Sequence, residues 1–118
     1  MKEFLLVFRT FNNPDFTPSP EQMQEGLTNW MNWMGGIAAQ NKLVNSGSRL
    51  SISNAKTVKP NNVIVDGPYT EIKEFINGYI VVKAANIDEA VDFAKGCPIL
   101  QIGGNVEVRA AVSSDDNS

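Results

Sequence analysis

The stretch VDGPYTEIKEFINGYIVV, residues 65 to 82, places two turn signals around a charged segment and ends in an apolar run. Asp66-Gly67-Pro68 has the residue types that end a strand and reverse the chain. Asn77-Gly78 suits backbone at positive φ, and the run from Tyr79 to Ala84 is rich in the β-branched and aromatic residues of strands. The stretch therefore predicts one strand over 63–65, a polar loop, and a second strand over 79–84.

Toward the N-terminus, the apolar run from Phe4 to Phe8 predicts a strand over residues 3 to 9. Ser19, Pro20 and Gln22 form a capping box with proline at the first helical position, so a helix begins at Pro20 and ends near Asn41. Apolar residues recur along it at steps of three and four and predict one buried stripe: Met23, Leu27, Trp30, Met31, Met34 and Ala38. Gly35-Gly36 inside the helix predicts close packing against a neighbour, or a kink.

Asn45-Ser46-Gly47 predicts a turn, followed by an irregular strand from Leu50 to Val58 that ends at the turn over 59–62. Asn86 caps a second helix, with Glu89 at the reciprocal capping position. The last strand is predicted over 106–112, where the valines share one face.

This order of elements indicates an α+β fold, a ferredoxin-like antiparallel sheet with two helices on one face. A sheet with one solvated face alternates apolar and polar residues, but the strands over 4–8 and 79–82 are apolar on both sides. The simplest way to bury the second face of the sheet is to pack it against the sheet of a second copy of the chain, so we expect a homodimer.

The 118 residues fit one domain over 1–112, with a disordered acidic tail over 113–118. Ten basic residues stand against thirteen acidic ones without forming a basic stripe, which argues against direct nucleic-acid binding. The apolar runs are too short to cross a membrane, and the expected location is cytoplasmic. Cys97 is alone, so no internal disulfide can form.

An ordered set of motifs resembles the YCII-related superfamily and, within it, the DGPF-type branch. The residues that carry the resemblance are Asp66-Gly67-Pro68-Tyr69, Glu71, Lys73-Glu74, Gly78-Tyr79, Asp88-Glu89-Ala90, Cys97-Pro98 and Gly104 to Arg109. The resemblance implies a ferredoxin-like fold assembled as a dimeric α/β barrel. It also implies a suggested enzymatic role, since many members carry a histidine and an aspartate in the cleft, and a link of some DGPF-type members to sigma factors in transcription initiation.

The chain contains no histidine. By the resemblance, Trp30 or a nearby helix residue stands where relatives have the histidine, and Cys97 stands where relatives outside this branch have the aspartate. A histidine and aspartate pair cannot be carried over to this chain.

Asp66 is the leading candidate catalytic and ligand-binding residue, because a carboxylate at a strand end facing a cavity can accept a proton or hold a donor. The alternative is a turn in which its side chain accepts backbone N–H groups. Glu71, with Lys73 and Glu74, lines the mouth of such a cavity or forms a solvated face.

Glu107 and Arg109 project from the last strand opposite its valines, where the arginine fork grips a carboxylate ligand or forms a structural ion pair. Trp30 and Trp33 wall a pocket, or they belong to the core or to an interface. Cys97 lacks a neighbour that would activate it as a nucleophile. The residues offer no metal site and imply no cofactor.

Three classes of function stay open. The first is a homodimer with a cavity between its sheets that binds a small organic molecule without an assigned reaction. The second is an enzyme in which Asp66, with a pKa raised by burial, performs acid and base chemistry. The third is a regulatory or interaction module in which the motif is only a turn.

Overall fold

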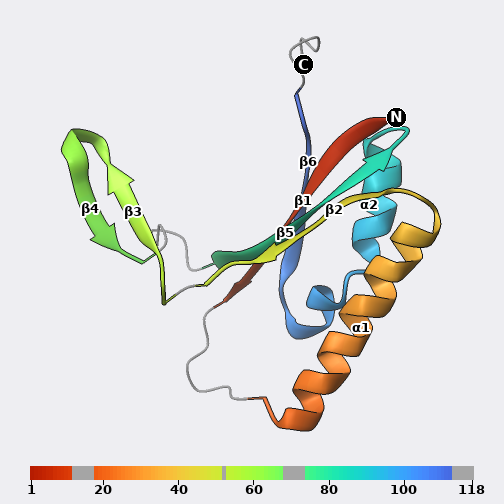
Figure 1. Cartoon of the computed structure of the whole chain (residues 1–118), viewed down its shortest axis with the longest axis horizontal. Coiled ribbons are helices and arrows are strands. Elements are labelled where there is room, and N and C mark those ends of the chain that lie inside the picture. Colours follow the sequence, from red (N-terminus) through yellow and green to blue (C-terminus); the bar gives the residue numbers. More distant parts are fainter. Residues whose placement is uncertain (12–17, 52, 68–73, 113–118) are drawn as a thin grey trace.

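The computed structural model describes residues 1–11, 18–51, 53–67 and 74–112, apart from the side chains of Phe11 and Glu74. Figure 1 shows the arrangement of the elements. In chain order they are β1 (Lys2–Phe11), α1 (Pro20–Ala39), β2 (Leu43–Arg49), β3 (Lys56–Lys59), the 3-10 helix η1 (Pro60–Asn62), β4 (Val63–Asp66), β5 (Glu74–Ala84), α2 (Ile87–Lys95), the 3-10 helix η2 (Pro98–Ile102) and β6 (Asn105–Ala110). No helix in these ranges is both long and apolar enough to cross a membrane.

The main sheet has the strand order β2-β5-β1-β6, and each neighbouring pair is antiparallel. This order, with α1 following β1 and α2 following β5, is the ferredoxin-like arrangement of an α+β fold. The predicted fold class is confirmed.

Both helices pack on one face of this sheet. Successive side chains of a strand point to opposite faces, and Phe4, Leu6 and Phe8 of β1 point toward the helices. They form one buried cluster with Ile80, Val82 and Ala84 of β5, Ile37 of α1, Ala90 and Ala94 of α2, and Cys97 and Ile99 beyond it. Val106 and Val108 of β6 pack against the same cluster, as the valine pattern predicted. The opposite side of the main sheet, here called the open face, meets neither helix in the described ranges.

Helix α1 begins as its sequence predicts. Gln22 N–H donates to Ser19 Oγ at 3.1 Å, and Ser19 N–H donates to Gln22 Oε1 at 2.8 Å, which completes the capping box. The predicted buried stripe is confirmed only at Trp30 and Met34, which are partly buried. Met23, Leu27 and Met31 are more than half exposed, and in the last turns Ala38 is exposed while Ile37 is buried. Among the described residues, only the later turns of α1 pack against the core, and the first turns do not.

The predicted close packing at Gly35-Gly36 is also wrong. A Cβ built at either glycine meets no atom of the described residues within 4 Å apart from its own helix backbone, and α1 is continuous through both residues. Within the part of the chain that the structure describes, neither a neighbour nor a kink accounts for the two glycines.

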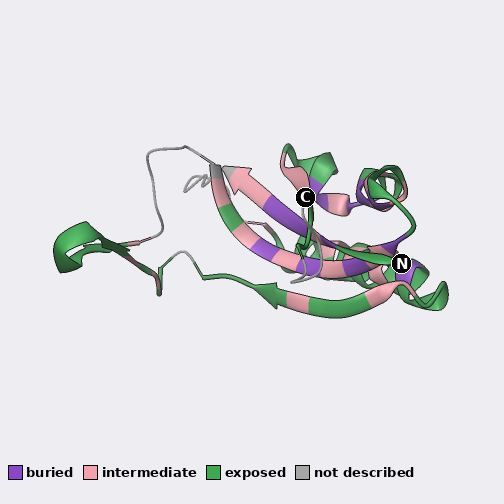
Figure 2. Cartoon of the chain, turned by 90° about the horizontal axis from the view of Figure 1, so that it is seen from above, coloured by how far each residue is buried: buried purple, intermediate pink, exposed green. Residues whose placement is uncertain are grey.

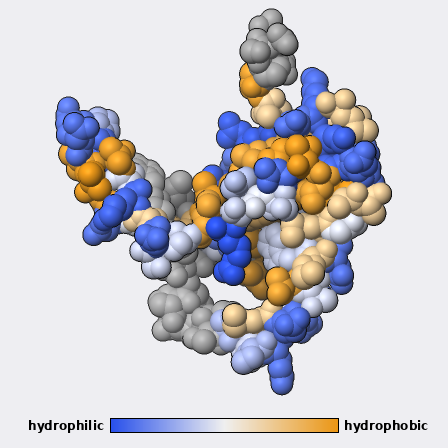
Figure 3. All heavy atoms as spheres, in the orientation of Figure 1, coloured by the Kyte–Doolittle hydropathy of each residue, from blue (hydrophilic) through white to orange (hydrophobic). Residues whose placement is uncertain are grey.

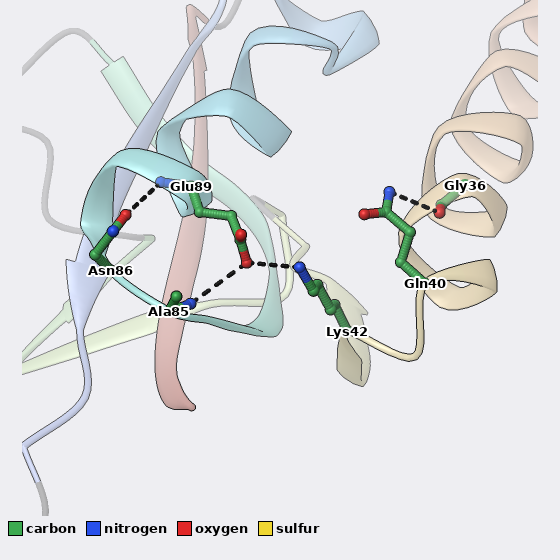
Figure 4. Close-up of polar contacts among 6 residues, drawn as sticks. All are labelled: Gly36, Gln40, Lys42, Ala85, Asn86 and Glu89. Atoms are coloured by element: carbon green, nitrogen blue, oxygen red, sulfur yellow. Dashed lines mark hydrogen bonds and ion pairs between the residues drawn. The ribbon is translucent and has the colours of Figure 1, made fainter.

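Hydrogen bonds and an ion pair join the start of α2 to Lys42, the residue that precedes β2 (Figure 4). Asn86 caps α2 by accepting from Glu89 N–H at 2.9 Å, as predicted. The Glu89 carboxylate accepts from Ala85 N–H at 3.3 Å and from Lys42 Nζ at 2.8 Å. The hydrogen bond from Lys42 holds the pKa of Glu89 below its usual value, so the ion pair that links the two segments persists into mildly acidic solution.

Two predicted turns lie inside strands instead. Asn45-Ser46-Gly47 belongs to β2, where the register against β5 shifts and Gly47 has φ +64°. Asn77-Gly78 belongs to β5, where Asn77 is the extra residue of a β-bulge opposite Phe8 and Arg9. A bulge uses the same residue types as a turn, because both need local backbone freedom without a regular ladder.

Residues 56–66 form a separate antiparallel hairpin, here called the hairpin arm, in which β3 pairs with β4. The strand predicted over 63–65 is therefore confirmed as a strand, but it belongs to this hairpin and not to the main sheet. The turn predicted over 59–62 is confirmed, with Asn61 and Asn62 at positive φ. In both views the hairpin arm stands apart from the main sheet and the helices (Figures 1 and 2), and all its residues are exposed except the partly buried Thr57.

Candidate functional site

The open face has an apolar centre built by β1 and β5. Leu5 lies opposite Val81, and Val7 lies opposite Tyr79. Val7 is buried, and the other three side chains are partly buried by their neighbours on the strands. The centre of the face is therefore apolar although neither α1 nor α2 covers it.

Beside this centre, β1 and β6 bring together three charged side chains, here called the Arg-Glu cluster: Arg9, Glu107 and Arg109. Arg9 Nη1 lies 2.5 Å from Glu107 Oε1, and Arg109 Nη1 lies 3.1 Å from Glu107 Oε2. The Arg9 side chain is 22% exposed and the Arg109 side chain is 71% exposed. Glu107 pairs with Nη1 of each guanidinium group, and most of the N–H donors of Arg109 remain in contact with solvent.

The two arginines keep Glu107 ionised. Hydrogen bonds from Arg109 and then Arg9 hold the pKa of Glu107 below its usual value. A general acid that works near neutral pH needs a carboxyl pKa raised toward 7, so the shift of Glu107 has the opposite direction. The cluster is suited to binding an anion and not to donating a proton.

Arg9 was not among the residues singled out from the sequence. It alternates with Leu5 and Val7, so period-two spacing places it on the same face, but only the register of β1 against β6 brings it to Glu107. The alternation along β1 can be read from the sequence, but the register of β1 against β6 cannot.

Asp66 lies at the end of β4, on the hairpin arm, away from the main sheet. Its side chain is 90% exposed and pairs across the hairpin with Lys56, with Oδ1 2.6 Å from Nζ. Within one chain, Asp66 does not meet the Arg-Glu cluster. Gly67, at φ +91°, extends the pairing of the hairpin arm by one residue, since its N–H donates to Ala55 O at 2.7 Å.

The remaining candidates lie elsewhere. Trp30 packs edge to face against Phe8 and Trp33, with ring centroids 4.8 and 5.5 Å away, on the helix side of the sheet. Glu71, with Lys73, lies outside the described residues, and nothing is described of the Glu74 side chain. The structure brings Glu107 and Arg109 together and leaves Trp30 and Asp66 apart from them.

Cys97 is 2% exposed, and burial raises the pKa of its thiol to about 11. The thiol therefore stays protonated and shielded near neutral pH, and it lacks the thiolate character of a nucleophile.

A shallow groove of about 420 Å³ lies between α2, η2 and β6 on the helix side of the sheet. Its walls are mainly apolar and include Val91, Leu100 and Val108. No residue singled out from the sequence as a site candidate lines it, so the groove does not coincide with the charged chemistry of the open face.

Comparison with known proteins agrees with this architecture. The family model of the YCII-related domain matches residues 4–112, which is nearly the whole chain. An uncharacterised protein of Rhizobium meliloti (strain 1021) is 42% identical over 33 residues, a segment that covers 28% of this chain and 27% of that protein. The matched segment thus spans about a quarter of that relative. On the strength of the family match and the ferredoxin-like fold, the chain belongs to the YCII-related domain family.

Proposed function

We propose that the protein is a homodimer of the DGPF-type branch, in which the open faces of two main sheets pack together as a dimeric α/β barrel and enclose a ligand cavity. The apolar centre supports this proposal, because Leu5, Val7 and Val81 point away from both helices and a face of this composition is normally covered. A two-fold contact places the same face of each copy against the other.

The ligand is a small organic anion with an apolar body. The observation that carries this assignment is the Arg-Glu cluster, which holds two guanidinium groups against one carboxylate beside an apolar surface. Guanidinium forks bind carboxylates in a planar, two-point geometry. Enclosure between two sheets strengthens such a contact, since it removes competing water. The chemistry supported is binding, because Glu107 is ionised and has no proton to donate.

Thermal unfolding in the presence of small carboxylates tests this assignment. Benzoate and hexanoate are expected to raise the melting temperature in a saturable way, whereas benzamide and hexanol, which lack the charge, are not. Arg109→Gln removes the exposed guanidinium and is expected to weaken carboxylate binding by about 10- to 100-fold, the range of a charge-assisted hydrogen bond.

Arg49→Gln is the matched control, since Arg49 is an exposed arginine at the end of β2 and outside the cluster. It should bind carboxylates as the unaltered protein does. Equal loss of binding in Arg49→Gln and Arg109→Gln, or no response of the unaltered protein to either carboxylate, would contradict the assignment.

A further inference from the structure

The hairpin arm exposes apolar side chains that its own chain does not cover. Val58, Val63, Ile64 and Val65 are 68%, 50%, 62% and 42% exposed. Figure 3 shows apolar side chains gathered on the arm between hydrophilic ones. A lone two-stranded hairpin is marginally stable in water. The arm is therefore better suited to a covered position than to the solvent it meets in a single chain.

One face of the arm combines an apolar pair with an ion pair. Val58 lies opposite Ile64, and Lys56 lies opposite Asp66. Residues opposite each other, and residues two apart along a strand, share one face of a hairpin. This face therefore presents an apolar patch followed at once by one positive and one negative charge.

The open face presents the complementary combination. Its apolar centre adjoins the Arg-Glu cluster, so an apolar patch is again followed by charges of both signs. The Asp66 side chain is 90% exposed and the Arg109 side chain is 71% exposed, which leaves both able to take a further partner. Lys56 can likewise face Glu107 when Asp66 faces Arg109. Charges matched in this way fix the register of an interface.

We propose that the hairpin arm of each subunit packs over the Arg-Glu cluster of the partner subunit, at the edge of the contact between the two sheets. There Asp66 takes part of the exposed guanidinium of the partner's Arg109, whose remaining donors hold the ligand, and Lys56 keeps the completed site positive. This inference rests on the homodimer of the proposed function. The occupant is a second copy because the arm and the open face of one chain lie apart in both views (Figures 1 and 2). Each cavity is then built from two chains. The Asp66 carboxylate, which lies far from the Arg-Glu cluster of its own chain, becomes part of the partner's site.

Cross-linking between two cysteine variants tests the inference. One chain carries Ile64→Cys on the arm, and the other carries Ala111→Cys, an exposed position two residues beyond Arg109 that leaves the Arg-Glu cluster intact. After the two variants are mixed and allowed to exchange subunits, a short bis-maleimide is added at neutral pH. Cys97 is buried, and with the pKa of its thiol raised to about 11 it contributes little background. The products are separated on a denaturing gel.

We expect a cross-linked dimer in the mixture, at least about tenfold above either variant alone, since only a mixed dimer brings the two cysteines together. Met23→Cys on exposed α1 replaces Ala111→Cys as the matched control and should give no such product. The chain carrying both Ile64→Cys and Ala111→Cys should cross-link between subunits. A cross-link between the two cysteines of one chain, with no cross-linked dimer, would overturn the inference.

The outcomes separate this inference from the proposed function. If light scattering shows a homodimer but the mixture gives no cross-link above the Met23→Cys control, the arm proposal is wrong and the sheet-to-sheet dimer stands. If light scattering shows a monomer for the unaltered protein, both are wrong.

Discussion

Replacing Val81 by Asp is expected to convert the homodimer into monomers at micromolar concentration. Val81 lies opposite Leu5 at the apolar centre of the open face, so the proposed interface would enclose one added carboxylate from each subunit. Enclosing an unpaired charge costs several kcal/mol. Because the two-fold contact contains the change twice, the dimer dissociation constant should rise by at least about 1000-fold. Sedimentation velocity over a range of concentrations measures the shift.

Ile87→Asp is the matched control for this change. Ile87 is an apolar residue at the first position of α2, 47% exposed and on the helix side of the sheet. An acid in the first turn of a helix is tolerated, and the variant should remain a homodimer. A folded Val81→Asp variant, with the circular dichroism of the unaltered protein and an unchanged dissociation constant, would exclude the open face as the interface.

Replacing Gly47 by Ala is expected to lower the free energy of unfolding by at least about 2 kcal/mol. Gly47 has φ +64°, a region that disfavours residues with a Cβ. An added Cβ would lie 1.6 Å from the carbonyl oxygen of Tyr79, so the edge strand β2 must move away from β5. Urea unfolding followed by circular dichroism measures the loss.

Gly36→Ala makes the same chemical change where the structure has room for it. Gly36 lies inside α1 at a helical φ, with no atom within 4 Å of the added Cβ. Alanine is favoured over glycine in a helix by roughly 0.5 to 1 kcal/mol, so this variant should be more stable than the unaltered chain. Equal effects of the two substitutions would mean that the strained bulge at Gly47 is not present in solution.

The fold was predictable from the sequence where one local signal decides the structure. The capping box at Ser19 and the cap at Asn86 predicted the starts of both helices, and the apolar runs over 4–8 and 79–82 predicted the two strands that the structure pairs at the centre of the sheet. The two misplaced turns share one physical cause. Asn45-Ser46-Gly47 and Asn77-Gly78 have turn chemistry, yet the long-range pairing of β2, β5 and β1 holds the chain extended and turns this local freedom into bulges.

The candidate site was predictable only in part, for a related reason. Glu107 and Arg109 share a face through the alternation of one strand, which the sequence reveals directly. Arg9 joins them through strand pairing between segments 98 residues apart, and the sequence does not reveal that pairing. The stripe from Met23 to Met31 has helical spacing, but spacing cannot say whether a partner covers it, and within one chain it is exposed.

The mass of the unaltered protein in solution tests the central claim most directly. Light scattering on a size-exclusion column at micromolar concentration should give about twice the 12.9 kDa of one chain. It should fall toward the mass of one chain for Val81→Asp and remain at twice that mass for Ile87→Asp. A folded, unaltered protein that elutes with the mass of a single chain would contradict the claim that two open faces enclose the site.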